Sequence, residues 1–159
     1  MNKRAIIKKI IDRLKSELEL YFRAAKAAHA EATHEQSRAE NKYDTRGLEA
    51  SYLARGQSRQ AAELEAAISA FEKMGASKFG PGEAIGLGAI VELEQGGRRT
   101  FYFVGPRAGG TEIVQDKTAV LVITPQSPLG EQLQGKKEGD RLRLTVAGVS
   151  DEYRVASVS

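Results

Sequence analysis

VLVITPQSPLGEQLQGKKEGD, residues 120–140, is the stretch that decides the fold. Its first residues belong to the continuous apolar run 119–123, which is typical of a central strand covered on both faces. Ser127 is a favourable helix N-cap, and Pro128 suits the first position of a helix because its missing N–H needs no partner there. The stretch therefore predicts a strand followed by one short helix at 127–133.

The segments around it alternate apolar and polar residues, as strands with one buried face do. Residues 90–94 and 100–104 flank Gln95-Gly-Gly-Arg98, which predicts a hairpin turn. Residues 141–146 and 152–156 alternate in the same way and predict a final strand pair. The second half of the chain should thus be a small, mostly antiparallel sheet that carries one helix.

The first half has the period of a helix instead. Residues 2–74 contain no proline and two glycines, Gly47 and Gly56. Apolar or small residues recur at spacings of three and four, which is the seam of a coiled coil. The two seams are Ile7, Ile11, Leu14, Leu18, Tyr21, Ala25, Ala28 and Ala32, and then Ala50, Ala54, Gln57, Ala61, Leu64, Ile68 and Phe71.

These periods predict an α+β chain with three parts: a coiled-coil hairpin at 1–75, a glycine-rich linker at 76–83 and a sheet domain at 84–159. The reversal of the hairpin should fall at 38–47, so each arm of roughly 30 residues would reach about 45 Å. Alanine dominates the seam toward this tip. We therefore expect the arms to approach each other more closely there.

Composition excludes several classes of site. The chain has 159 residues, a formal charge of +3 and no Cys, so disulfides and thiolate metal sites are ruled out. Charged residues interrupt the apolar N-terminal segment, which argues against a signal peptide, and no run of about 18 apolar residues could span a bilayer. We expect a protein of the reducing cytoplasm, with no membrane partner.

Candidates for chemistry are few. His29 and His34 are five residues apart and point to different faces of a helix, so we interpret both as surface residues. No nucleophile elbow, Walker or dinucleotide pattern is present, which indicates no catalytic centre of its own.

The predicted tip is the exception, because it carries Glu40, Asp44 and Glu49. Glu40 and Asp44 are four residues apart, so on a continued helix their carboxylates would share one face, and Glu49 could converge with them across the turn. Exposed carboxylates hold Mg²⁺ only weakly, so a partner would have to supply the remaining ligands. Otherwise these acids merely solubilise a loop.

The stretch 120–140 resembles the C-terminal signature of the Gre family of bacterial transcription elongation factors. In that family a strand leads to a Ser-Pro-hydrophobic-Gly helix and then to Gly-Lys-x-x-Gly-Asp. Phe103-Val-Gly-Pro106 is also similar to a family motif, and the order of hairpin, linker and FKBP-like sheet matches over nearly the whole chain.

The resemblance implies a partner and a mechanism. Gre-type factors bind RNA polymerase through the C-terminal domain and pass the hairpin down the secondary channel. Acidic tip residues there help to hold a Mg²⁺ ion of the polymerase, which then cleaves its own backtracked transcript. For this chain it implies Asp44, Glu49 and Glu40 as tip acids, and Ser127, Pro128, Leu129, Gly130 and Lys136 as polymerase-binding residues.

It also implies an accessory factor, not an enzyme. Such a factor would be a cytoplasmic monomer with no cofactor of its own, and it would meet nucleic acid only within the elongation complex. The tip, however, departs from the family pattern. When Glu49-Ala-Ser-Tyr52 is set on the corresponding family segment, Thr45 and Leu48 fall where the acidic pair should stand. An inhibitor or modulator without cleavage activity is therefore an alternative.

Two further interpretations stay open. An FKBP-like sheet can be a prolyl isomerase or peptide-binding chaperone, with ring candidates Phe101, Tyr102, Phe103 and Tyr153. The first helix can also bind nucleic acid directly through a basic stripe formed by Lys3, Arg4, Lys8, Lys9, Arg13, Lys15, Arg23 and Lys26.

Overall fold

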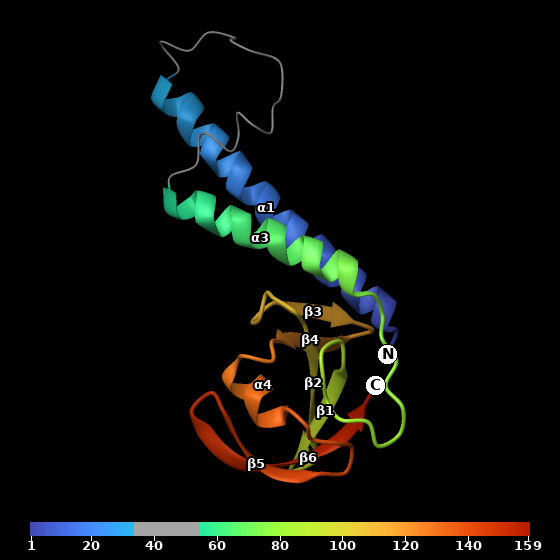
Figure 1. Cartoon of the computed structure of the whole chain (residues 1–159). Helices are drawn as coiled ribbons and strands as arrows, with labels where there is room; N and C mark the ends of the chain where they lie inside the picture. The colour runs from blue at the N-terminus through green and yellow to red at the C-terminus, as the bar shows by residue number, and fades with distance from the viewer. Residues whose placement is uncertain (34–54) are drawn as a thin grey trace. The chain divides into compact units, whose positions relative to one another are not determined.

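The computed structural model describes residues 1–33 and 55–159 (Figure 1). These residues belong to two compact units, one made of residues 1–11 with 69–159 and the other of residues 12–68. The predicted tip at 38–47, with Glu40 and Asp44, lies outside the described residues, as does Glu49. The domain boundaries at 75 and 84 stay predictions.

Two helices, α1 (Lys3–Thr33) and α3 (Arg55–Met74), run antiparallel (Figure 1). On the exposed side of α1, ion pairs one turn apart join Arg13 Nε to Glu17 Oε1 at 3.1 Å and Arg23 Nε to Glu19 Oε1 at 3.2 Å. No helix in the described ranges is long and apolar enough to cross a membrane. The pair of helices confirms the helical half of the predicted fold class.

The buried side of α1 differs from the predicted seam at Tyr21, among other positions. Leu14, Leu18 and Ala25 are buried as expected, but Phe22 is buried in place of Tyr21. The Tyr21 ring stays partly exposed, and its hydroxyl bonds to Gln60 Oε1 on α3. A hydroxyl keeps a polar partner at the edge of a helix pair, whereas Phe22 has no polar atom to satisfy.

Two predicted seam positions, Ala28 and Gln57, are not buried, while Ala32, Ala50 and Ala54 lie outside the residues whose burial the structure describes. Ala28 is exposed on α1, and residues 56–60 of α3, including Gln57, are exposed as well. Among the described residues, the buried contact therefore ends near Ala25 and Ala61. An alanine removes little apolar area from water, so a seam of alanines is weakly stabilised.

The second half of the chain forms six strands and one short helix. In chain order they are β1 (Ile90–Gln95), β2 (Arg98–Val104), β3 (Glu112–Gln115), β4 (Thr118–Ile123), α4 (Pro128–Leu133), β5 (Arg141–Val146) and β6 (Val149–Val158). The predicted turn between β1 and β2 is confirmed: Gly96 and Gly97 have φ of 54° and 79°, as a two-residue hairpin turn requires.

The sheet is mixed, in the order β3-β4-β2-β1-β6-β5. Four of the five neighbouring pairs are antiparallel, which confirms the expectation of a mostly antiparallel sheet, and β2 and β4 form the one parallel pair among the described strands. Strand β3 is an addition that the sequence did not predict. It enters as a hairpin partner of β4, and this hairpin places β4 parallel to β2.

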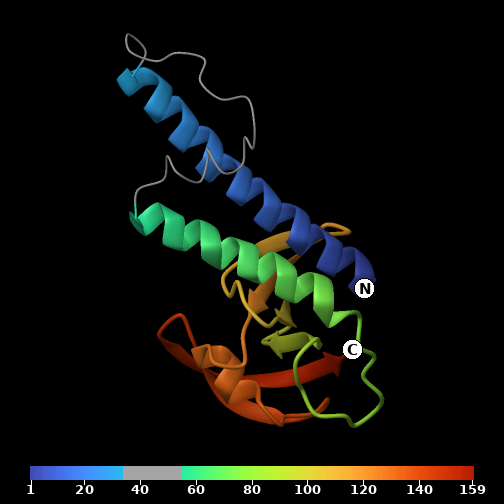
Figure 2. The ribbon, with the colours of Figure 1, turned by 45° about the horizontal axis from the view of Figure 1, so that its top comes forward.

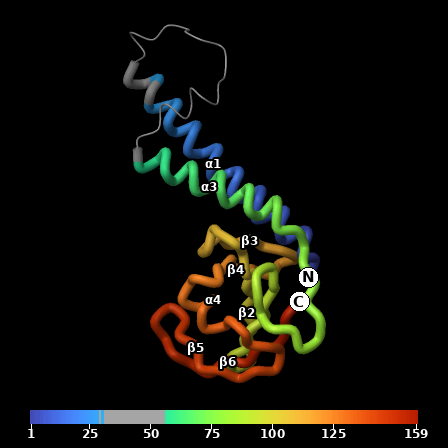
Figure 3. Tube along the Cα trace, viewed as in Figure 1, coloured from blue at the N-terminus to red at the C-terminus, as the bar shows by residue number. Residues whose placement is uncertain are grey.

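Each face of the sheet is covered differently. On one face, Val91 and Leu93 of β1 and Val155 of β6 form a core with Leu133 of α4, and all four side chains have 0% exposure. Figure 3 shows α4 lying over this face beside β5. On the other face, the Phe103 ring packs against Phe71 of α3, with centroids 6.2 Å apart.

Strand β4 is less enclosed than predicted. Val120 and Val122 are fully buried, but Ala119 is exposed and Leu121 is only partly buried. Its position agrees with this: β4 is second from the edge of the sheet, not at the centre.

The first turn of α1 is tied to the segment after α3. Lys3 Nζ donates to the Ser77 carbonyl at 2.6 Å and lies 4.7 Å from the centre of the Phe79 ring. Burial lowers the pKa of Lys3 below its ordinary value, and the Glu83 carboxylate opposes that shift. Both ends of the chain line one hollow of about 520 Å³ here, and Figure 3 shows the two ends close together. The predicted linker is therefore partly anchored.

Candidate functional site

The signature around α4 is held by local hydrogen bonds. Ser127 caps the helix: its Oγ accepts from the Gly130 N–H at 3.2 Å and donates to the Thr124 carbonyl at 2.7 Å. Pro128 occupies the start of the helix, as predicted. The N-cap prediction is therefore confirmed. The Ser127 hydroxyl uses both of its hydrogen bonds to hold the start of the helix.

Gly130 is buried at a point where the chain crosses itself. A Cβ built there would lie 1.8 Å from the Thr124 carbonyl oxygen, which is far inside contact distance. Only a glycine lets the helix approach the end of β4 this closely. Of the predicted polymerase-binding residues, Ser127 and Gly130 therefore shape the surface from within.

The Gly-Lys-Lys-Glu-Gly-Asp segment forms two turns after α4. Gly135 and Gly139 have φ of 77° and 91°, which favours glycine at both positions. Asp140 Oδ2 accepts from the Lys137 N–H at 2.9 Å, and the Lys136 carbonyl accepts from the Ile85 N–H at 2.8 Å. The segment is thereby fixed against the residues before β1 and leads directly into β5.

What remains for a partner is the outer side of this signature. The Pro128 side chain is exposed, while Leu129 and Lys136 are partly buried. These three are the predicted binding residues whose side chains reach the surface, and Leu129 also packs against the core beneath it. The structure thus places an apolar side chain, a proline ring and a basic side chain on one segment, which consists of α4 and the turn that follows it.

The basic stripe on α1 is largely engaged within the chain. Lys9 Nζ donates to the Val114 carbonyl at 2.7 Å, and Lys3, Arg13 and Arg23 have the partners described above. Lys8 and Lys15 also interact within the chain. Six of the eight cations of the stripe thus have a partner within the chain.

The aromatic residues do not converge. Along β2, Phe101 and Phe103 point to one face of the sheet and Tyr102 to the other, since side chains alternate along a strand. Phe103 is fully buried against Phe71, and Tyr102 belongs to the core beneath α4 together with Tyr153. This arrangement gives no support to a proline-binding pocket.

No group of three or more His, Cys, Asp or Glu side chains that could hold a metal occurs within residues 1–33 and 55–159. The three tip acids fall in the part of the chain between these ranges.

Comparison with known proteins decides the family. Residues 80–159, which include all six strands and α4, match the family model described as transcription elongation factor, GreA/GreB, C-terminal. The chain belongs to the Gre family. Its signature segments at 103–106 and 120–140 both lie within the matched residues.

Gre-family relatives match beyond the C-terminal half. The transcription inhibitor protein Gfh1 of Thermus aquaticus is 32% identical over 123 residues, which cover 73% of this chain and 71% of that protein. Gfh1 of Thermus thermophilus is 33% identical over 123 residues, covering 73% and 72%. The crystal structure of GreA factor homolog 1 from Thermus thermophilus has 29% identity, covers 94% of both chains and gives a TM-score of 0.40.

Proposed function

We propose that this Gre-family chain binds bacterial RNA polymerase and inhibits transcription elongation. The observation that carries the proposal is the extent of the matches. The family model matches 80 residues, 80–159, whereas the similarity to the two transcription inhibitors spans 123 residues and so reaches into the helices. The similarity to those proteins therefore includes residues before the sheet domain as well as the sheet domain.

In this proposal the C-terminal domain is the anchor. The accessible side chains of Pro128, Leu129 and Lys136 contact polymerase, while Ser127 and Gly130 hold their backbone in place. The apolar Leu129 supplies contact area and Lys136 supplies charge. Rigid presentation helps because little conformational freedom is lost when the partner binds.

The helices form the arm that enters the secondary channel. The 31 residues of α1 reach about 46 Å at 1.5 Å per residue, and this length suits an arm. Their exposed sides carry i,i+4 ion pairs, as suits a solvated arm. The acids Glu40, Asp44 and Glu49 belong to the segment between the two described helices.

Two observations favour inhibition of transcription over stimulation of transcript cleavage. The matched relatives are named transcription inhibitors, and Thr45 and Leu48 stand where a gapless comparison expects the family's acidic pair. Carboxylate oxygens are ligands that Mg²⁺ accepts, so Asp44, with Glu40 or Glu49, would share a polymerase ion without forming a complete site. The chain itself then supplies no catalytic centre.

The test is transcript cleavage in stalled elongation complexes of a bacterial RNA polymerase. We expect neither the wild-type chain nor Asp44→Asn to raise cleavage above the rate of polymerase alone, while the wild-type chain slows RNA extension in the same reactions. Cleavage that the wild type stimulates and Asp44→Asn loses would instead show a cleavage factor that uses Asp44.

The proposal also places the chain in the cytoplasm, where polymerase acts, as a monomer with no nucleic-acid contact outside the elongation complex. Light scattering during gel filtration tests the monomer. Retention on naked DNA or RNA at 150 mM salt would contradict the last point, since phosphate contacts dominate such binding.

A further inference from the structure

The sheet has two edges, and a helix side chain covers part of each. At the β3 edge, Lys9 Nζ from α1 donates to the outward carbonyl of Val114 at 2.7 Å. At the β5 edge, the Gln132 amide of α4 pairs with both outward groups of Thr145: Oε1 accepts from the N–H at 2.8 Å and Nε2 donates to the carbonyl at 3.2 Å. Gln132 thus mimics one residue of a neighbouring strand.

The register of β5 shows which backbone groups remain open. In an antiparallel pair, successive residues point their N–H and C=O alternately toward and away from the partner strand. Thr145 points away from β6, and the Asp140 carbonyl, five residues earlier, accepts from the Val155 N–H at 2.9 Å and points toward it. Arg141 and Arg143 therefore point away, as Thr145 does.

These outward groups have no strand beside them. Strand β5 ends the sheet order, and no element within residues 1–33 or 55–159 pairs with the backbone of Arg141 or Arg143. Figure 2 shows the hairpin of β5 and β6 (orange to red) curving at the border of the sheet. Leu142 and Leu144 anchor the strand in the core beneath α4. The open edge is therefore held in strand geometry.

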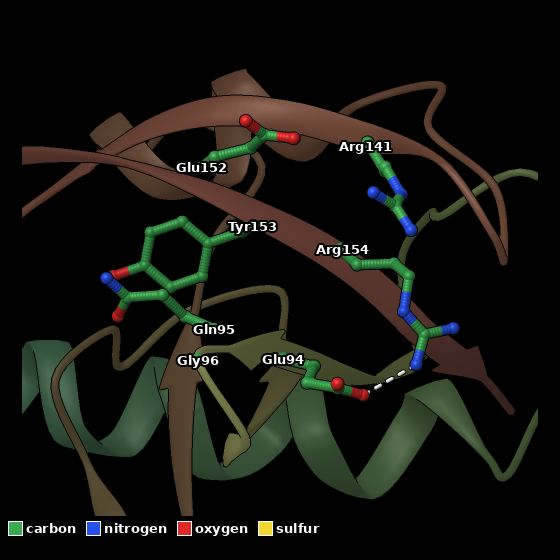
Figure 4. A pocket seen from close by; sticks show the side chains of 7 residues that line it. All are labelled: Glu94, Gln95, Gly96, Arg141, Glu152, Tyr153 and Arg154. Atoms are coloured by element: carbon green, nitrogen blue, oxygen red, sulfur yellow. Dashed lines mark hydrogen bonds and ion pairs between the residues drawn. The ribbon is translucent and has the colours of Figure 1, made fainter.

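The outward positions of the same stretch carry two arginines, Arg141 and Arg143, next to Asp140 in the chain. Arg141 lies directly opposite Arg154, whose guanidinium is already paired with Glu94 Oε2 at 2.5 Å (Figure 4). Like charges opposite one another destabilise a strand pair. Within residues 1–33 and 55–159, neither Arg141 nor Arg143 forms an ion pair, although Glu152 lies opposite Arg143. An additional carboxylate at this edge would relieve the repulsion.

We propose that the edge of β5 at Arg141 and Arg143 binds an extended, acidic segment of a partner protein. The segment would add a strand through the two outward backbone pairs, with carboxylates at alternate positions beside the two guanidinium groups. Gln132 ends the binding stretch at Thr145. The inference does not depend on polymerase being the partner.

The first test titrates the full chain with the peptide acetyl-Thr-Glu-Val-Glu-Val-Glu-Thr-amide, followed by backbone amide NMR. We expect the largest shifts at Arg141 and Arg143, and binding weakened at least about tenfold in the double variant Arg141→Glu, Arg143→Glu, because two charge contacts reverse sign. Arg98→Glu is the matched control, since Arg98 is equally exposed but lies on β2. It should bind as the wild type does.

A second pair of variants separates backbone pairing from charge. Arg143→Gln removes the charge alone, whereas Arg143→Pro also removes the outward N–H, which the β5–β6 pairing does not use. We expect the proline variant to keep its fold by circular dichroism and to bind several-fold more weakly than the glutamine variant. Gln132→Ala should bind more tightly, because it frees Thr145.

Three results would overturn the proposal. Equal binding by Arg143→Gln and Arg143→Pro would show a charge contact without strand addition. Tighter binding of an eight-nucleotide single-stranded RNA than of the peptide, lost in the same double variant, would show a phosphate site. No shifts at Arg141 or Arg143 at millimolar peptide would show that these arginines only discourage pairing at an exposed edge.

Discussion

Gly130 is the residue whose neighbourhood is least tolerant of change. The atom that a side chain would meet, the Thr124 carbonyl oxygen, belongs to the backbone and cannot swing aside. We expect Gly130→Ala to lower the free energy of unfolding by about 3 kcal/mol, at the upper end of the cost of overpacking. Urea denaturation monitored by circular dichroism measures it.

Gly86→Ala is the control for that experiment. A Cβ at Gly86 meets nothing within 4 Å, and its backbone does not require positive φ. Its stability should stay within about 0.5 kcal/mol of the wild type. Unfolding of the two alanine variants at the same urea concentration would contradict the close approach of Gly130 to the Thr124 carbonyl.

Residue-scale inference from the sequence succeeded where a local rule applies. Ser127 as N-cap, Pro128 at the helix start and the two turn glycines at 96 and 97 follow from the conformations that these residue types favour. The contacts of Lys9 and Gln132 did not follow, because both reach strand edges that are far away in sequence.

At the scale of elements, the end of α3 meets the sheet through Gly105. A Cβ there would lie 2.7 Å from Phe71 Cζ and 3.0 Å from Val122 Cγ1. This explains the glycine of the Val-Gly-Pro motif: it makes room for an aromatic ring from the helix. The same ring packs against Phe103, so Phe71 of α3 contacts two positions, 103 and 105, at the end of β2 and just after it.

A double-mutant cycle tests this contact. We expect Gly105→Ala to cost about 1–3 kcal/mol, because the ring must shift. Phe71→Leu removes the atoms that collide, so the double variant should be more stable than the sum of the single effects by about 1 kcal/mol. Additive effects within about 0.3 kcal/mol would show that Gly105 and Phe71 do not interact.

The elements that sequence reasoning missed lack local signals. Strand β3 has four residues, and its turn uses Asp116 and Lys117 at φ of 49° and 65° without a glycine to mark it. The parallel pairing of β2 with β4 depends on that strand, so it could not be predicted either. The burial of Ile6 and Ile10 beyond the predicted seam likewise reflects packing outside a two-helix repeat.

The whole molecule combines a Gre-family sheet domain with two long helices, and we propose a different task for each part. The sheet domain presents Pro128, Leu129 and Lys136 on a rigid segment, and the helices carry the acidic segment between them. The sequence allowed the family and the partner to be inferred because its signature residues are those that close packing and capping require. The acids at 40, 44 and 49 have no such constraint, so their role stays a proposal.

The most direct measurement of the central claim is the rate of RNA extension by a purified bacterial RNA polymerase, with and without saturating amounts of the full chain. We expect slower extension with the wild-type chain. The effect should be weakened several-fold in the variant Leu129→Asp, because a charge would replace the apolar contact on the proposed polymerase-binding surface while α1 and α3 stay unchanged. Circular dichroism of the variant checks that it folds. An unchanged extension rate at saturating wild-type chain would contradict the account.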